Sequence, residues 1–233
     1  MNGILWAAVA VTIVVGAIAA WTWDAWSRDR NILIAFLIGL PLSALANVYV
    51  KTPVITGIER ITWPSVSGSA PWRFLWLVLW VAPLVEEAAK LLPLAVPDIR
   101  QSLASPRMPF RYGMASGFGF GLGEAWYLAW GISQSRMDAG LPFYYFTGFM
   151  SERLLVAFAH GVMTSVAVNG VASSGASAPG GYAGAVALHA LLNAGALAYQ
   201  AGLIGSSASN IAMLVSIIVL AVVFERMRQV VNV

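Results

Sequence analysis

Long apolar runs alternate with short polar segments along the whole chain. Each run holds roughly 18 to 25 residues, the length that a helix rising about 1.5 Å per residue needs to cross a hydrocarbon core of about 30 Å. Backbone groups inside a bilayer must bond to one another, so these runs are helices. The pattern predicts an all-α integral membrane protein, a polytopic bundle of about seven transmembrane helices. The expected spans are 3–22, 31–50, 72–96, 112–133, 150–171, 180–201 and 207–225.

Composition supports this prediction. Of the 233 residues, 59% are hydrophobic and 10% are charged, which lies outside the range of ordinary soluble domains. The chain has no cysteine, which excludes disulfides, thiolate metal sites and a thiol nucleophile. Its net charge is +3, and no lysine or arginine run is long enough to indicate nucleic-acid binding. We therefore expect residues 1–233 to form a single transmembrane domain in the lipid bilayer.

The polar segments read as loops. The longest, around 51–71, is rich in Thr, Pro, Ser and Gly, and 171–181 reads as a flexible connector.

Basic residues predict the orientation. The side that holds the first, third, fifth and seventh connections or ends has Arg28, Arg30, Arg100, Arg107, Arg111, Arg226 and Arg228. The other side has Lys51, Arg60, Arg73, Arg136 and Arg153. Seven against five favours a cytoplasmic location for the first group in a multi-pass plasma-membrane protein, with the N-terminus outside and the C-terminus cytoplasmic.

Charged side chains interrupt two of the apolar runs. A charge at the bilayer centre costs roughly 2.5–3.5 kcal/mol, so Glu86, Glu87, Lys90 and Glu124 are expected to face the bundle interior. Lys90 lies four residues after Glu86 and three after Glu87, so one amine can pair with either carboxylate. A single Glu/Lys pair is most often structural, but the second carboxylate exceeds what one amine neutralises and so favours chemistry.

Further polar residues occupy three other expected spans. Glu124, His160, His189 and Asn193, like Glu87, lie about nine to thirteen residues from one face, roughly 14–20 Å deep. Helices that run in alternating directions are not expected to place their polar side chains at one depth unless these side chains meet.

Each of these residues also has a structural interpretation. A membrane histidine often only bonds neighbouring helices, and His189 with Asn193 four residues later can do the same. Arg153 is expected near a helix end, where its side chain reaches to the interface and plays at most a supporting part. The glycines of 113–123 indicate close helix packing. Pro83 and Pro93 flank the glutamate pair and can distort the helix around it.

Four motifs in one order resemble a known family. Glu86-Glu87-Ala88-Ala89-Lys90 matches EExxK, and Phe120 to Glu124 matches FxxxE. Arg153, His160 and Gly170 match Arg-x6-His-x9-Gly, and His189 to Asn193 matches HxxxN. This order is similar to that of the PrsW intramembrane proteases, relatives of the CAAX prenyl endopeptidases and bacteriocin-processing (CPBP) proteins. The resemblance covers about residues 72–201, with two N-terminal helices (3–50) and one C-terminal helix (207–225) outside this core.

The resemblance implies cleavage of peptide bonds in membrane-anchored protein substrates. It nominates Glu86, Glu87, Glu124, His160, His189 and Asn193 as catalytic residues, with Lys90, Phe120 and Arg153 in support. The prenyl-endopeptidase branch usually has EExxxR and FxxxH instead, so its substrate class does not transfer.

Amide hydrolysis without a nucleophilic serine or cysteine requires activated water. The predicted mechanism is of the glutamate type: Glu86, helped by Glu124, is the base, and His189 and Asn193 donate to the oxyanion. Glu87 with Lys90 gives electrostatic support, and His160 bonds within the cluster. Because the carboxylates are crowded, one of them is expected to keep its proton and act as the acid.

Three alternatives stay open. A metal such as zinc or iron can be held by ligands from Glu86, Glu87, Glu124, His160 and His189, although the spacing lacks HExxH and we favour a metal-free site at this stage. A proton-coupled transporter also places Glu, Lys and His at mid-membrane, but no internal repeat is visible. A scaffold for other membrane segments needs no such cluster.

Overall fold

The structure is a computed structural model that describes residues 2–25, 29–63, 70–134, 141–173 and 177–231. All regular structure in these ranges is helical. The α-helices are α1 Gly3–Ala25, α2 Arg30–Ala46, α3 Thr52–Thr62, α4 Trp72–Lys90, α5 Pro97–Ser102, α6 Met108–Ser133, α7 Thr147–Ala172, α8 Ser177–Gln200 and α9 Ser206–Val231. A π-helical turn, Asn47–Lys51, joins α2 to α3, and short 3-10 turns cover Leu92–Ala95 and Phe143–Phe146.

Five of the described helical segments are long and apolar enough to cross a membrane. They are Gly3–Trp21, Arg30–Thr62, Phe143–Ala172, Ser177–Gln200 and Ser206–Val230. The chain is therefore an all-α integral membrane protein, as the sequence predicts. The other two expected spans coincide with α4 and α6, which carry the buried charges Glu86, Glu87, Lys90 and Arg111.

The expected loop at 51–71 is wrong over its first half. The helix that begins at Arg30 continues through the π-helical turn and α3 to Thr62, while residues 64–69 lie outside the described part. Turn-forming residue types misled the prediction, because Pro53 is tolerated in the first turn of α3. The connector at 171–181 is also shorter than expected, since α8 already begins at Ser177.

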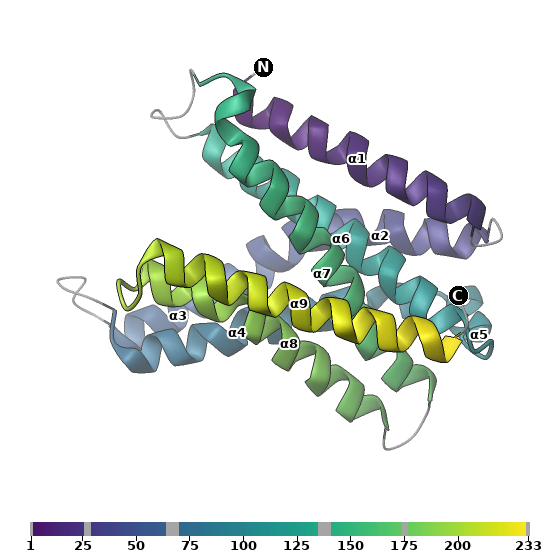
Figure 1. The fold of residues 1–233 in the computed structure, drawn as a ribbon. Coiled ribbons are helices and arrows are strands. Elements are labelled where there is room, and N and C mark those ends of the chain that lie inside the picture. Colours follow the sequence, from purple (N-terminus) through teal and green to yellow (C-terminus); the bar gives the residue numbers. More distant parts are fainter. Residues whose placement is uncertain (1, 26–28, 64–69, 135–140, 174–176, 232–233) are drawn as a thin grey trace.

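Helix α6 lies inside the bundle and packs against α1, α2, α4, α7 and α9. Helix α8 packs on α7, and α9 packs on α8 (Figure 1). The N-terminal end of α1 and the C-terminal end of α9 lie at opposite ends of the bundle (Figure 1).

Two glycine stripes bring α6 close to its neighbours. A Cβ on Gly117 or Gly121 would meet the backbone of α7, and one on Gly119 or Gly123 would meet the backbone of α2. At Gly121 the distance from such a Cβ to Ala157 Cα is only 2.6 Å. The predicted packing role of these glycines is confirmed. Small residues allow this approach because helices in lipid associate through backbone contact rather than the hydrophobic effect.

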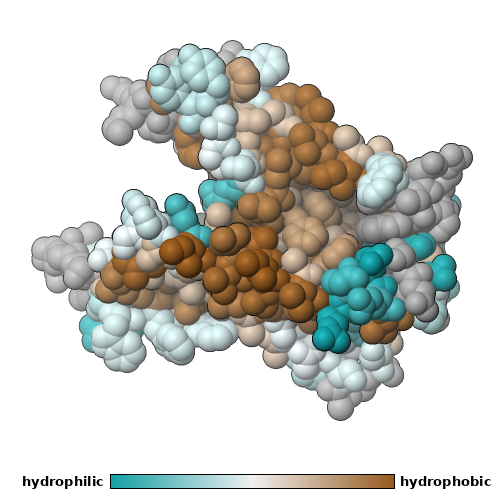
Figure 2. Space-filling view, in the orientation of Figure 1, coloured by the Kyte–Doolittle hydropathy of each residue, from teal (hydrophilic) through white to brown (hydrophobic). Residues whose placement is uncertain are grey.

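The outer face of α9 is apolar. Its exposed side chains include Ile211, Leu214, Val215, Ile218 and Val222. Figure 2 shows this apolar surface over α9, with hydrophilic residues at the C-terminal end of the helix. Such a surface fits contact with lipid acyl chains.

Gly121→Ala tests the close packing of α6 on α7. The new methyl group overlaps Ala157, and overpacking of this kind should lower the free energy of unfolding by about 1–3 kcal/mol. The measurement is unfolding of the purified protein in detergent. Gly131→Ala on the same helix is the matched control, because a Cβ there has open space, and it should be neutral or slightly stabilising. Equal effects of the two substitutions would contradict the packing account.

Candidate functional site

Helix α4 turns a charged stripe inward. Its buried residues are Pro83, Glu86, Glu87 and Lys90, which recur at the three- and four-residue spacing of one helix face. The opposite face, including Leu84, Val85 and Ala88, lines an apolar groove toward α2. The helix thus shows apolar residues outward and charges inward, as expected where lipid surrounds the bundle.

Pro93 ends α4 one turn after the glutamates, since it has no N–H and disfavours helical backbone at the preceding residue. Pro83 does not break the helix. The distortion expected around the glutamates is therefore absent from α4.

Lys90 connects two helices through its ammonium group. Its Nζ donates to Glu87 Oε1 over 2.6 Å and to His160 Nδ1 over 2.5 Å. Neither the Lys90 nor the Glu87 side chain is exposed. The ring of Phe120 lies against both Lys90, with Nζ 4.8 Å from its centroid, and His160, with centroids 5.3 Å apart. Phe120 therefore forms an apolar wall of the cluster.

The hydrogen bonds of His189 fix its tautomer. Its Nδ1 lies 2.7 Å from Glu87 Oε1, and because a carboxylate only accepts, Nδ1 carries the proton. In the neutral ring Nε2 then presents a lone pair. A carboxylate that orients a histidine in this way is typical of metal ligands.

Glu86 is held by a lysine from another helix. Lys51 Nζ lies 2.6 Å from Glu86 Oε1, and the exposed fractions of the two side chains are 18% and 2%. The second oxygen, Oε2, is buried, accepts no hydrogen bond and lies 3.7 Å from His189 Nε2. Lone pairs of Glu86 Oε2 and His189 Nε2 thus face each other. A cation bound between them, or a proton on Nε2, would remove the repulsion between these lone pairs.

Glu124 joins α6 to α7. Its Oε2 accepts from Arg153 Nη1 at 3.0 Å and lies 3.3 Å from His160 Nε2. Since Lys90 donates to His160 Nδ1, the ring proton is on Nε2 and points to Glu124. Arg153 also pairs with Glu152. The expectation that Arg153 reaches to the membrane surface is wrong, because its side chain is only 10% exposed and serves Glu124.

These contacts form one connected network of charges. Each of Glu86, Glu87 and Glu124 has its own cation. The sequence reasoning counted Lys90 as the one cation beside the paired glutamates, which is wrong, because Lys51 pairs with Glu86. The expected protonated carboxyl stays a prediction. With the half-exposed Glu152 included, four carboxylates face Lys51, Lys90 and Arg153, a net charge of −1 with neutral histidines.

The structure thus brings together most of the residues nominated by sequence. Those that meet are Glu86, Glu87, Lys90, Phe120, Glu124, Arg153, His160 and His189. Asn193 is partly exposed and makes no hydrogen bond to another described residue. Sequence reasoning missed Lys51, which was assigned to a loop. The available signal was the charge imbalance itself, because three buried carboxylates with one amine require further cations.

Glu86, His160 and His189 can converge on one ion. One ligand atom from each lies within 4.8 Å of the others, and all three residues are buried. Two imidazoles and one carboxylate form a common catalytic zinc set that leaves a position open. Two ligands about 2.0–2.1 Å from a tetrahedral zinc lie roughly 3.4 Å apart, close to the 3.7 Å between Glu86 Oε2 and His189 Nε2. The residues therefore fit a metal, although His160 must release Lys90 or Glu124 to offer a nitrogen.

Comparison with known proteins adds the family. The model of the PrsW family of intramembrane metalloproteases matches residues 3–224. This range includes the N-terminal helices and most of α9, beyond the 72–201 over which the motifs alone carried the resemblance. Neither a search of curated proteins nor one of solved structures gives a match.

Lys90→Met tests how much the buried ion pair matters. The substitution leaves the Glu87 carboxylate without its cation, which should cost about 3–5 kcal/mol of unfolding free energy. Adding Glu87→Gln to the same chain should recover most of the loss. Detergent-based unfolding measures both.

Arg228→Met is the matched control for this test. Arg228 also pairs with a glutamate three residues away, Glu225, but both side chains are nearly half exposed. Its loss should leave unfolding almost unchanged. A similar effect at both pairs, or no recovery in the double variant, would contradict the network described above.

Proposed function

Because the chain belongs to the PrsW family of intramembrane metalloproteases and is thus a peptide hydrolase, we propose that it cleaves membrane-anchored protein substrates with a divalent metal held by Glu86, His160 and His189. The observation that carries the proposal is the convergence of these three buried side chains from α4, α7 and α8. It replaces the metal-free glutamate mechanism as the favoured account. The metal kept open from the sequence is supported by the family description and by this geometry.

The charge of the network supports a cation at this position. Four carboxylates against three cations leave one negative charge before a metal binds. The unpartnered Oε2 of Glu86 faces the lone pair of His189, so a cation here would gain two ligands without displacing a hydrogen bond. When bound, a divalent metal supplies Lewis-acid activation of water and of the scissile carbonyl.

The chain's own residues hold the ligands in place. Glu87 keeps the proton of His189 on Nδ1 and so leaves Nε2 free for coordination. Lys90 bonds both Glu87 and His160, which ties the two histidines to one ammonium group. Removing Glu87 would therefore release His189, and removing Lys90 would release His160. Phe120 excludes water from one side of the pair.

The metal-dependent account changes two of the assigned roles. A neutral His189 has no proton on Nε2, so it cannot donate there to an oxyanion. Asn193 has its amide free and stays the proposed donor. Glu124 becomes the proposed base and proton carrier, because a base must reach the reacting water and Glu124 is the most exposed of the three glutamates. Its side chain is 14% exposed, whereas Glu86 is 2% exposed and Glu87 is fully buried.

The remaining sequence predictions belong to the same proposal. We keep a single transmembrane domain with a catalytic core at about 72–201. Helices α4 and α6 cross the membrane beside the five apolar spans, which makes seven spans in all.

We also keep the kinship with the CAAX prenyl endopeptidases and CPBP proteins, which rests on the shared order of the motifs. A structure of such a protein in which the helices that carry these motifs are arranged differently would count against the kinship.

Glu86→Gln tests the metal site directly. The amide keeps the size of the side chain but removes its charge, so bound metal and proteolysis should both fall by at least about 100-fold. Metal content is measured by mass spectrometry of the purified protein. Proteolysis is measured on single-span reporter proteins in liposomes. Chelation of the unaltered protein should abolish cleavage, and zinc should restore it.

Glu59→Gln is the control, because it makes the same change on α3 at a residue that takes part in none of the hydrogen bonds or ion pairs of the described cluster. It should keep its metal and its activity. Full cleavage by a metal-free protein would overturn the metal-dependent account in favour of the glutamate mechanism. Ion flux in the same liposomes without cleavage would favour the transporter.

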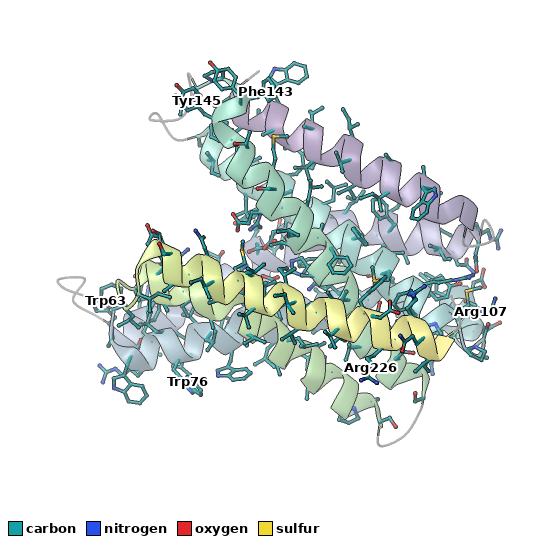
Figure 3. The ribbon with its side chains drawn as sticks, in the orientation of Figure 1. Trp63, Trp76, Arg107, Phe143, Tyr145 and Arg226 are labelled. Atoms are coloured by element: carbon teal, nitrogen blue, oxygen red, sulfur yellow. The ribbon has the colours of Figure 1, made fainter. Side chains whose placement is uncertain are left out.

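The predicted orientation also belongs to the proposal, and the structure changes its basis. Lys51 and Arg153 contact the buried cluster, so they do not count as loop charges. Of the five basic residues on that side, Arg60, Arg73 and Arg136 remain, and Arg136 lies outside the described residues. Arg107 and Arg226 lie toward one end of the bundle, and Trp63, Phe143 and Tyr145 toward the other (Figure 3). This strengthens the bias toward a cytoplasmic C-terminus.

Cysteine labelling of whole cells measures this orientation without background, because the chain has no cysteine of its own. A membrane-impermeant thiol reagent should label Tyr145→Cys in intact cells and Arg107→Cys only after the membrane is opened. The reverse pattern would place the N-terminus inside.

A further inference from the structure

Among the residues that the structure describes, Lys51 is the one member of the charge network that comes from the segment preceding α4. It lies outside the four sequence motifs. Its Nζ lies 2.6 Å from Glu86 Oε1 and its side chain is 18% exposed. The contact therefore links the helical segment Arg30–Thr62 to a proposed metal ligand on α4.

The local backbone directs Lys51 toward Glu86. Lys51 is the last residue of the π-helical turn, in which the N–H of Thr52 bonds to Asn47 five residues earlier. Pro53 explains this turn, because it has no N–H for the Tyr49 carbonyl and its ring crowds that carbonyl. A π-helical turn takes up an extra residue and rotates the following side chains by up to about 100° relative to a continuous α-helix.

Neighbouring residues show the result of this turn. Tyr49 and Val50 point outward, with exposed fractions of 73% and 45%, while Lys51 is turned to the interior. The side chain of Asn47 stabilises the turn by donating to the Ser43 carbonyl at 2.8 Å. π-Helical turns within α-helices are frequent at functional sites.

Lys51 leaves the two oxygens of Glu86 in different environments. Oε1 is occupied by the ammonium group, and Oε2 is buried without a hydrogen bond and faces His189 Nε2 at 3.7 Å. A carboxylate fixed through one oxygen presents the other in a defined direction. Hydrogen-bonding partners of metal ligands act in this way, and their loss typically costs 10- to 100-fold in metal affinity or activity.

We infer that Lys51 is a positioning residue that holds Glu86 by Oε1 and thereby aims Oε2 at the metal position next to His189. This inference rests on the proposed function for the identity of the ligand. The contact between Lys51 and Glu86 is independent of that function and can be tested without metal.

The first experiment measures zinc affinity and turnover of Lys51→Met and Lys51→Arg. Lys51→Met should hold zinc 10- to 100-fold more weakly in competition with a chelating dye. Its kcat should fall by a similar factor while KM changes by less than about threefold, because a positioning residue acts on the reaction through Glu86 rather than through substrate binding. Lys51→Arg keeps the charge and should recover most of both losses. Arg60→Met, which removes a positive charge from the exposed side of α3, should match the unaltered protein.

Unchanged zinc affinity in Lys51→Met, or a Lys51→Arg variant no better than Lys51→Met, would overturn the inference. Rescue by arginine separates positioning from simple filling of space, because methionine matches the length of the lysine chain but carries no charge.

The second experiment is a thermal-unfolding cycle of the metal-free protein with Lys51→Met, Glu86→Gln and both together. Lys51→Met alone should lower the unfolding temperature, since it leaves the Glu86 carboxylate without its cation, and the double variant should recover most of the loss. Additive losses would overturn the ion pair and with it the inference. If the unaltered protein binds no zinc, the proposed function fails, and the unfolding cycle still decides the role of Lys51 in holding Glu86.

Discussion

Ion pairing in a medium of low dielectric constant is the constraint on which the site depends. Glu86, Glu87 and Glu124 can all lie inside the bundle because Lys51, Lys90 and Arg153 lie beside them. The histidines join these pairs into one network, with His189 between Glu86 and Glu87 and His160 between Lys90 and Glu124. The same contacts that make the buried charges tolerable therefore also fix the tautomers of both imidazoles, and the tautomer of His189 leaves its Nε2 open for the proposed metal.

Backbone packing makes this network geometrically accessible. A side chain at Gly117 would collide with the His160 carbonyl, and one at Gly121 would lie 3.1 Å from the His160 ring. The absence of side chains there lets α7 come close enough for His160 to reach Glu124 on α6. A second close approach, between Gly170 and Gly181, brings α7 against α8, which carries His189. Glycine positions and charged positions thus depend on one another, so a packing defect should also affect the proposed metal ligands.

Much of this arrangement was predictable from sequence, and the reason is energetic. Charges in apolar runs have to meet, so the convergence of Glu86, Glu87, Lys90, Glu124, His160 and His189 followed from their depth and type. The pairing was not predictable, because the spacing allows Lys90 to pair with either glutamate. In the structure Lys51 pairs with Glu86, and Lys90 pairs with Glu87. Lys51 itself was missed because Thr52 and Pro53 suggest a loop, whereas the structure continues the helix through a π-helical turn. The sequence predicted about seven apolar spans, whereas five of the described helical segments are long and apolar enough to cross a membrane. Helix α4 is not among the five, because Glu86, Glu87 and Lys90 lower its mean hydropathy.

X-ray absorption spectroscopy at the zinc edge of the zinc-loaded protein in lipid tests the central claim most directly. The account predicts a first shell of nitrogen and oxygen at about 2.0–2.1 Å, with outer-shell scattering from the imidazole rings of both histidines of the chain. Replacing His189 by alanine should remove one ring from that spectrum. A shell without imidazole scattering, or a spectrum that His189→Ala leaves unchanged, would contradict a metal centre built from Glu86, His160 and His189.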